Sequence, residues 1–581
     1  MRQKMLLAFA AGAMLASCGE SENAEGPEVA DLLFSGGTVY TVDGDATVAE
    51  AIAVRGDKIL YVGSAEGAKA YVGPNTLTED ISGKIVFPGF TDSHAHLPDG
   101  GDTILGLGLG GLTSAEQIVH AVKAYADAHP ELPAIMGSGW ELNLFPDANP
   151  NKALLDEIVP DRPVMLVAAD GHNGWVNTRA LDLAGVTSET ADPVNGRIER
   201  DAEGNPTGTL RESAQGLVSH IFPKPAVEDV VRNLEAGLAY QAGNGITATI
   251  DAAIMHDHNE AAYLEVSSRQ DLPQRVRLSL LAAEEMVTSM VTPDNVEAVV
   301  EKLVERRAQF RAQAKDRLDA DAVKIFVDGV PENHTAAMLE PYVNAPLGPD
   351  HRGEINLSEE ALNAYAIALE NAGFQIHIHA IGDRAVRVSL NALEGAIETN
   401  GERPRRHHLS HLEIVQPEDI QRFAPLGVTA NLQALWHFND AYISELTEPF
   451  LQEKLHRWIY PAKSFVNAGA RVVWGSDWPV STSDPFDSME VAVLRKNPDD
   501  ANDQSWIPEE RLSVDDMIKA LTINGAYLMG QEDIRGSLEV GKQADFILVD
   551  ADPYKVLPED ISDIRVLRTY IGGRQVFSAA E

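Results

Sequence analysis

Eight short apolar runs, several of them preceded by an amphipathic helical stretch, constrain the fold of this chain more than any other feature. Each run has the length and composition of a buried strand. Helical stretches at 296–314, 358–372 and 417–424 precede the fourth, fifth and seventh runs. This alternation predicts an α/β protein with a parallel (β/α)8 barrel, whose chemistry lies at the carboxyl ends of the strands. The runs are 85–90, 246–251, 276–282, 322–327, 375–379, 407–412, 428–432 and 472–474.

Two regions lie outside this alternation. The gap between the first and second runs is far longer than one crossover helix, so 112–239 is predicted to be an inserted subdomain after barrel strand 1. Both chain ends carry short strand-like runs, at 32–39, 51–54 and 58–62 and again at 537–540, 544–549, 566–571 and 575–577. We expect segments 30–86 and 534–581 to build one small composite β-domain, with the barrel at 87–533. Two unrelated terminal appendages are the alternative.

The N-terminal segment resembles a bacterial lipoprotein signal peptide. Arg2 and Lys4 precede an apolar run, 5–15, that is too short to span a bilayer, and Leu-Ala-Ser-Cys ends it at Cys18. The pattern predicts a signal peptide at 1–17, a lipid on Cys18 and a polar tether at 18–29. The protein would then be lipid-anchored in the bacterial cell envelope and face the periplasm. A plain secretory signal is the alternative.

Composition excludes one class of partner and one kind of metal site. The chain has 88 acidic and 46 basic side chains and a formal charge of −42, which excludes nucleic acid as its main partner. Cys18 is the single cysteine, so neither an intramolecular disulfide nor a thiolate cluster can form. Any metal must bind histidine, carboxylate or modified lysine.

Histidine and aspartate side chains recur at the ends of the predicted strands. His94 and His96 close the first run, and residues two apart on a strand face the same way. A lone His-X-His also occurs where two polar side chains begin a loop. However, His379 ends the fifth run, His411 the sixth and Asp477 the eighth. Four imidazoles and a carboxylate on one rim predict a divalent metal site, which zinc, manganese, cobalt or iron would suit.

Lys324 lies inside the fourth run. An ammonium pointing into a metal-lined barrel would repel the cations and lose its hydration. A buried lysine readily loses its proton, and the neutral amine can take up CO2 to form a carbamate that bridges two metals. An ion pair with Asp328 or Asp251 is the alternative.

Several motifs resemble those of the amidohydrolase superfamily. They are Pro-Gly-Phe-Thr-Asp-Ser-His-Ala-His at 88–96, His-Ala-Ile-Gly-Asp-Arg at 379–384 and Gly-Ser-Asp-Trp-Pro at 475–479. Together with 139–141, 170–172, 175–177 and 206–212, they are similar to its YtcJ-like branch, which includes N-substituted formamide deformylases. The resemblance runs from about residue 30 to the C-terminus. It implies a hydrolase with a TIM-type barrel and a composite β-sandwich from both chain ends.

The resemblance also implies a centre of one or two divalent metal ions, with zinc the expected metal. The ligand set that it implies is His94, His96, Lys324, His379, His411 and Asp477. His94 and His96 would bind the more buried metal, and His379 and His411 the more exposed one. The carbamate of Lys324 would bridge the two metals. Asp477 would also be catalytic, because it would accept the proton of the attacking water and pass it to the leaving amine.

Other side chains near the motifs have two interpretations each. His172, Trp175 and Arg384 are predicted to bind substrate; the alternatives are a structural hydrogen bond, a core position and a surface ion pair, respectively. His377 faces the same way as the metal-facing histidine of its strand but one layer deeper, and we expect it to be a core histidine. Glu212 is either a substrate or metal contact or a solvated carboxylate.

The sequence therefore predicts a metal-dependent hydrolase of a carbon–nitrogen bond other than a peptide bond. Candidate substrates are an N-acyl or N-formyl amine, an N-acyl amino acid and a cyclic amide. The alternatives are an esterase or lactonase that uses the same site, and a non-catalytic surface-anchored binding lipoprotein. The expected partners are a small-molecule substrate, the membrane through Cys18 and a second copy of the chain in a homodimer.

Overall fold

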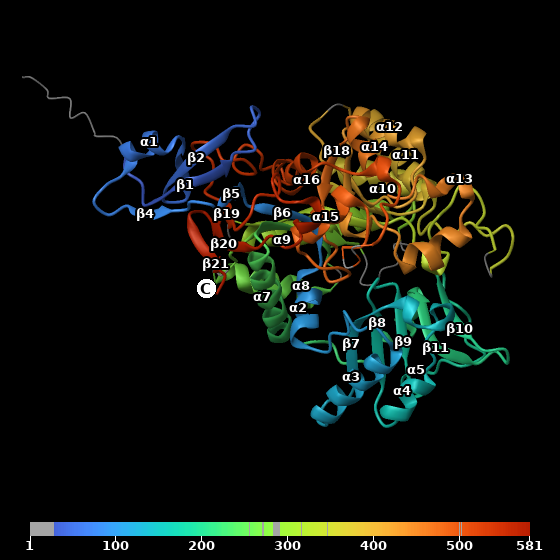
Figure 1. Cartoon of the computed structure of the whole chain (residues 1–581). Coiled ribbons are helices and arrows are strands. Elements are labelled where there is room, and N and C mark those ends of the chain that lie inside the picture. The colour runs from blue at the N-terminus through green and yellow to red at the C-terminus, as the bar shows by residue number, and fades with distance from the viewer. Residues whose placement is uncertain are drawn as a thin grey trace, which may run out of the picture.

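The computed structural model describes residues 28–580, except for 255, 270–271, 283–290, 315–316, 345–346, 402, 499 and 501. The predicted signal peptide, Cys18 and nearly all of the tether lie outside the described residues. Three sheets organise the rest: a barrel sheet, a sheet at the chain ends and the sheet of an insertion. In Figure 1 the terminal sheet lies at the left, the barrel at the centre and upper right, and the insertion at the lower right.

The barrel sheet contains eight strands in the order β18-β17-β16-β15-β14-β13-β12-β6, and every pairing within it is parallel. The strands follow the predicted runs, which confirms the expected parallel α/β architecture, a nearly closed TIM-type barrel. They are β6 (Phe90–Ala95), β12 (Ile246–Ile254), β13 (Arg275–Leu281), β14 (Leu318–Phe326), β15 (Gln375–Ala380), β16 (His408–His411), β17 (Thr429–Leu432) and β18 (Arg471–Trp474).

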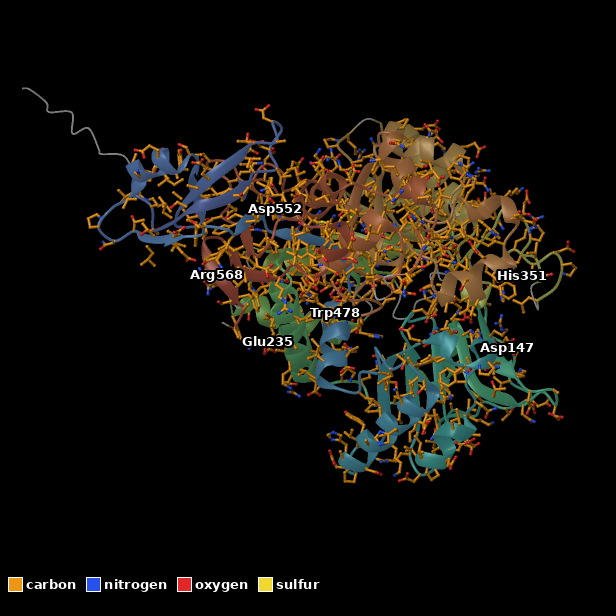
Figure 2. All side chains as sticks on the ribbon, in the orientation of Figure 1. Asp147, Glu235, His351, Trp478, Asp552 and Arg568 are labelled. Carbon is orange, nitrogen blue, oxygen red and sulfur yellow. The ribbon has the colours of Figure 1, made fainter. Side chains whose placement is uncertain are left out.

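The segment after β18 closes the barrel at its carboxyl rim. The backbone N–H of Asp477 donates to the carbonyl of His94 at 2.7 Å, and that of His96 donates to the carbonyl of Trp478 at 2.8 Å. Trp478 lies near the middle of the molecule, between the terminal sheet and the insertion (Figure 2). Closure therefore takes place at the two segments that carry candidate metal ligands.

Helices cover the outside of the barrel and pack their apolar faces on the strands. Those on the predicted helical stretches are α9 (Val296–Gln313), α10 (Glu359–Asn371) and α12 (Pro417–Leu426). No helix within the described part of the chain has the length and apolarity needed to cross a membrane. The others around the barrel are α2 (Leu97–Leu105), α7 (Val227–Gly243), α8 (Asp257–Ser268), α11 (Asp383–Asn400), α14 (Ala462–Asn467), α15 (Pro485–Leu494), α16 (Val514–Leu521) and α17 (Ile523–Leu528).

The predicted first run is two strands rather than one. β5 (Ile85–Pro88) pairs with strands of the terminal sheet, whereas β6 begins the barrel. The break falls at Gly89, where a Cβ atom would lie 2.2 Å from a methyl carbon of Thr247. Both strands are buried throughout, so one continuous apolar run conceals the change of sheet. His94 consequently lies within β6 and His96 just beyond its end.

The terminal sheet joins strands from both chain ends in the order β21-β20-β19-β5-β1-β2-β3, with β4 beside β1. The predicted strand at 537–540 is wrong: this stretch is a loop whose Leu538 is buried in the core of the sheet without joining a ladder. The predicted limits of the domain stay a prediction. The strands are β1 (Leu32–Tyr40), β2 (Val48–Arg55), β3 (Lys58–Gly63), β4 (Leu77–Asp80), β5, β19 (Phe546–Val549), β20 (Val566–Ile571) and β21 (Arg574–Ser578).

The insertion has a five-stranded sheet and a core of its own. The predicted range 112–239 also includes most of α7, but the buried side chains of that helix belong to the core of the barrel. α7 is therefore the crossover helix that leads into β12. The insertion contains β7 (Ile135–Trp140), β8 (Val164–Ala168), β9 (Asn173–Val176), β10 (Gly196–Arg200), β11 (Pro206–Glu212), α3 (Ala115–Ala128), α4 (Ala153–Ile158) and α5 (Thr178–Ala184).

Candidate metal centre

The six predicted ligands meet at the carboxyl end of the barrel. β15 shows how the sequence directs them inward: Ile376 and Ile378 belong to the apolar core cluster, while His377 and His379 alternate with them. The remaining candidates come from β6 and the residue that follows it, from β14, from β16 and from the loop after β18. All are buried except His96, whose side chain is 18% exposed.

The first half of the centre consists of His94, His96 and Asp477. Oδ1 of Asp477 lies 3.3 Å from Nε2 of His94 and 3.1 Å from Nε2 of His96. One ligand atom from each of the three residues lies within 4.8 Å of the others. Two imidazoles and a carboxylate at this spacing are a typical partial ligand set for a catalytic divalent metal.

Asp92, a buried aspartate that the sequence patterns did not indicate, links the two segments that carry this half of the centre. Asp92 accepts hydrogen bonds from the backbone N–H groups of His94 at 3.1 Å and Ser476 at 3.0 Å, and from the hydroxyl of Ser476 at 2.5 Å. It therefore joins β6 to the loop that carries Asp477. Its position two residues before His94, on the same face of the strand, is the sequence feature that could have indicated it.

The second half consists of His379 and His411. Their ring centroids are 4.6 Å apart, and the His411 ring lies 4.8 Å from that of His94. The Nδ1 atoms of both are buried without a hydrogen-bond partner among the described residues, and Nδ1 of His411 lies 3.8 Å from Asp477. Buried polar atoms are normally satisfied, so orphaned ring nitrogens that face a carboxylate are suited to a metal.

Backbone strain marks both halves. Asp477 has a φ of 56° and His411 a φ of 79°, in a region that residues other than glycine rarely adopt. Such conformations cost about 1–3 kcal/mol each and persist where the surrounding structure enforces them. The fold therefore holds these two side chains in place at a cost to stability.

Lys324 lies between the two halves. Its Nζ is 3.2 Å from Nε2 of His94, and the residue is 1% exposed. Burial lowers the pKa of Lys324 to about 7 despite the opposing charge of Asp477. Within the described residues it forms no ion pair: Asp328 accepts three backbone N–H groups, and Asp251 accepts the hydroxyl of Tyr263. The amine therefore has an appreciable neutral fraction at neutral pH.

This donor set fits a divalent metal. Neutral imidazoles, one carboxylate and a lysine of lowered pKa converge where burial also holds the pKa of His94, His379 and His411 well below the usual value for histidine. Neutral histidine is the form that binds a metal. Hard and borderline metals such as zinc suit these nitrogen and oxygen donors.

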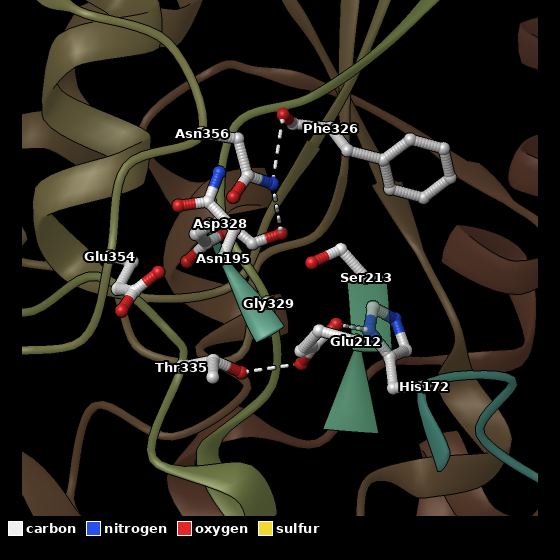
Figure 3. Close-up of a pocket in the computed structure, with 10 residues that line it drawn as sticks. All are labelled: His172, Asn195, Glu212, Ser213, Phe326, Asp328, Gly329, Thr335, Glu354 and Asn356. Atoms are coloured by element: carbon white, nitrogen blue, oxygen red, sulfur yellow. Dashed lines mark hydrogen bonds and ion pairs between the residues drawn. The ribbon is translucent and has the colours of Figure 1, made fainter. Parts of the chain in front are cut away.

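A small pocket opens beside His379, between the insertion and β14 (Figure 3). Asp328, in its wall, lies 3.3 Å from Nδ1 of His379, and the ring of His172 lies 5.6 Å from the His379 ring. Of the described residues that line the pocket, none is lysine or arginine. They are His172, Asn195, Glu212, Ser213, Phe326, Asp328, Gly329, Thr335, Glu354 and Asn356.

His172 and Glu212 form a buried pair at the wall of this pocket. Nδ1 of His172 lies 2.7 Å from Glu212, which also accepts the hydroxyl of Thr335 at 2.6 Å. Burial alone lowers the pKa of His172, but the charge and hydrogen bond of Glu212 outweigh it and raise the pKa to about 9. The imidazole is therefore protonated at neutral pH, and Glu212 is not the solvated carboxylate of the alternative interpretation.

The structure does not bring the other two predicted substrate contacts to this pocket. Trp175 is fully buried and packs edge-to-face on Trp140 and Phe145 in the core of the insertion. Arg384 lies in the first turn of α11, 3.3 Å from Glu359, with its side chain 38% exposed. Both positions agree with the alternative interpretation given for each residue.

Similar proteins span most of this chain. It is 32% identical to Protein LONG AFTER FAR-RED 3 of Arabidopsis thaliana, with 94% of this chain and 92% of the relative covered. It is 31% identical to the putative amidohydrolase YtcJ of Bacillus subtilis (strain 168), with 94% and 99% covered. It is 27% identical to the N-substituted formamide deformylase of Arthrobacter pascens, with 94% and 98% covered.

Solved structures share the fold. An uncharacterised metal-dependent hydrolase from Pyrococcus furiosus superposes with a TM-score of 0.67 at 24% identity, with 90% of this chain and 100% of that chain covered. An atrazine chlorohydrolase from Arthrobacter aurescens TC1, complexed with zinc, gives a TM-score of 0.51 at 17% identity, with 94% and 95% covered. A model of the amidohydrolase family matches residues 78–577. The chain therefore belongs to the amidohydrolase family and is a hydrolase.

Proposed function

We propose that this chain hydrolyses a carbon–nitrogen bond, other than a peptide bond, in a small molecule. The observation that carries the proposal is the convergence of His94, His96 and Asp477 with the second pair of histidines at one end of the barrel. The 27% identity to an N-substituted formamide deformylase over 94% of the chain supports an amide substrate.

The six predicted ligands would hold one or two divalent metal ions, with zinc the first candidate and a carbamate on Lys324 as the bridge. A metal bound there would polarise the scissile carbonyl of the substrate and lower the pKa of the attacking water. The carboxylate of Asp477 then accepts the proton of the attacking water and returns it to the nitrogen of the departing amine. Its backbone hydrogen bond to His94 holds it in position for both transfers.

His172 contributes a fixed positive charge at the edge of the centre. Its Nδ1 is engaged by Glu212, so Nε2–H is the donor available to the substrate. A protonated imidazole in this position stabilises the negative charge that develops on the carbonyl oxygen in the transition state. This assigns to His172 the substrate contact that the sequence predicted.

The walls of the pocket favour N-acyl or N-formyl amines over N-acyl amino acids. Its ionisable residues are three with carboxyl groups, Glu212, Asp328 and Glu354, and one imidazole, that of His172. A free substrate carboxylate would therefore meet an excess of acidic groups, and the described lining offers it neither lysine nor arginine. A neutral or cationic amine portion meets no such repulsion.

Amine release from a substrate panel tests the proposal. The purified chain, with zinc and with chelator, is offered matched N-formyl and N-acetyl amines, an N-acyl amino acid, a cyclic amide and the corresponding esters. We expect zinc-dependent release from the N-acyl amines. Cleavage of the esters alone would favour the esterase alternative, and metal binding without any turnover would favour the binding lipoprotein.

Localisation is a separate part of the proposal. We propose that Cys18 carries the lipid that anchors the chain on the periplasmic side of the cell envelope, where it would act as a homodimer. Cys18→Ser should move the protein from the membrane fraction to the soluble periplasmic fraction without changing its metal content. A wild-type protein that is already fully soluble would contradict the anchor, and its mass in solution tests the dimer.

A further inference from the structure

We infer that His377 is a positioning residue, which fixes the ring of His94 so that Nε2 faces the metal centre. This inference rests on the proposed metal centre. His377 lies on β15, across the barrel interior from β6, and is fully buried. Its Nε2 lies 3.1 Å from Nδ1 of His94, and the two rings meet edge-to-face with centroids 4.7 Å apart.

Two serines fix His377 in turn. Its Nδ1 lies 3.0 Å from the hydroxyl oxygen of Ser279 on β13, and its Nε2 lies 2.9 Å from that of Ser410 on β16. Both ring nitrogens are therefore engaged by neighbouring strands, so the ring can neither flip nor rotate without losing hydrogen bonds. Leaving a buried ring nitrogen unpaired is unfavourable, which makes this arrangement the favoured one.

The positions of the protons follow from this chain of contacts. A metal-binding His94 presents the lone pair of Nε2 to the metal, so its proton sits on Nδ1 and must be donated. Nε2 of His377 is the acceptor within reach, and the proton of His377 then sits on Nδ1 and is donated to Ser279. The Ser279–His377–His94 chain thus selects the tautomer of His94 that binds a metal. Partners of this kind typically change metal affinity by about 10- to 100-fold.

His408 provides a matched control for packing. It is also fully buried inside the barrel, and its ring lies 4.0 Å from that of His377. Neither of its ring nitrogens has a hydrogen-bond partner among the described side chains. Replacement of His408 by phenylalanine therefore disturbs the same layer without removing a hydrogen bond to His94.

Zinc affinity, measured on the purified full-length chain by competition with a chromophoric chelator, tests the inference. His377→Phe keeps a ring in place but removes the acceptor, and we expect zinc to bind about 10- to 100-fold more weakly. His377→Gln places an amide oxygen within reach of His94 and should restore most of the affinity. His408→Phe should bind zinc much as the wild type does. Thermal unfolding of each variant identifies any that fail to fold.

The possible outcomes separate the inference from the proposed function. Wild-type zinc affinity in a folded His377→Phe protein overturns the positioning role. Equal losses in His377→Phe and His408→Phe also overturn it, because they would indicate packing alone. A wild-type chain that binds no zinc would instead contradict the proposed centre. If His377→Phe does not fold, the comparison of His377→Gln with His408→Phe decides: weaker binding by the glutamine variant than by His408→Phe counts against the role.

Discussion

The two halves of the candidate centre differ in how completely the protein alone arranges them. In the first half, the ligand atoms of His94, His96 and Asp477 are already within 4.8 Å, and Asp92 braces the backbone on both sides. In the second half, His379 and His411 face each other with Nδ1 atoms that lack hydrogen-bond partners among the described residues. The first half is thus braced by hydrogen bonds of its own, whereas the Nδ1 ring nitrogens of the second half are free to bind a metal.

Their surroundings differ in the same way. In the first half, the second ring nitrogen of His94 is engaged by His377 from within the barrel interior. The second half borders the pocket, and the ring of His172 in the insertion lies 5.6 Å from that of His379. We infer that the barrel holds the metal and that the insertion, which brings His172 to the edge of the centre, selects the substrate.

The largest effect is expected from the first half. Asp477→Asn keeps the shape of the side chain but removes its charge and its ability to accept a proton. Turnover should fall by about 10²- to 10⁴-fold, as is typical for the loss of a general base. Steady-state kinetics on the substrate identified by the panel measure the fall. An Asp477→Asn protein with normal turnover would show that the first half is not the reactive one.

Lys324→Ala should have the next largest effect, because it removes the link between the halves. If Lys324 carries a carbamate, both metal occupancy and turnover should fall, since two cations would face each other without the anionic bridge. Formate or acetate in the vacated space should restore part of the rate. Metal content by mass spectrometry and rates with added formate measure this. Unchanged metal content with normal turnover would show that Lys324 does not bridge the metals and lies outside the centre.

His172→Ala tests the division of roles between barrel and insertion. We expect kcat/KM to fall for every N-acyl amine, because the charge that stabilises the oxyanion is lost. The ratio of kcat/KM between two N-acyl amines of different size should also change by about 10-fold, a typical value for altered pocket contacts. Zinc affinity should stay near that of the wild type, because His172 is not among the six ligands. Lost zinc binding in a folded His172→Ala protein would place this residue in the second half of the centre itself.

Arg384→Ala should have the smallest effect. Its partner Glu359 and its own side chain are both substantially exposed, and such surface pairs contribute about 0–1 kcal/mol. Neither turnover nor substrate preference should change, and the unfolding free energy measured with urea should move within that range. Weakened binding of a carboxylate-bearing substrate would instead restore Arg384 to the substrate site.

The sequence predicts the barrel and both sets of histidines because these depend on local patterns. Apolar runs locate the strands, and His94, His379 and His411 lie at the carboxyl ends of theirs. The change of sheet at Gly89 was missed because both strands are buried and the run is continuous in hydropathy.

Contacts across the barrel could not be predicted in the same way. The hydrogen bond between His94 and His377 joins strands that are far apart in the order of the sheet, and it exists only once the barrel closes. The sequence therefore indicated a buried core histidine but not its partner. The same holds for Asp92, whose contact with Ser476 spans 384 residues of chain.

X-ray diffraction at the zinc absorption edge, on crystals of the chain grown with zinc, locates the metal directly. We expect an anomalous peak within bonding distance of His94, His96 and Asp477, with any second peak beside His379 and His411. A well-ordered barrel mouth without a peak, in crystals of enzyme that hydrolyses its substrate in the presence of chelator, would contradict the proposed metal centre.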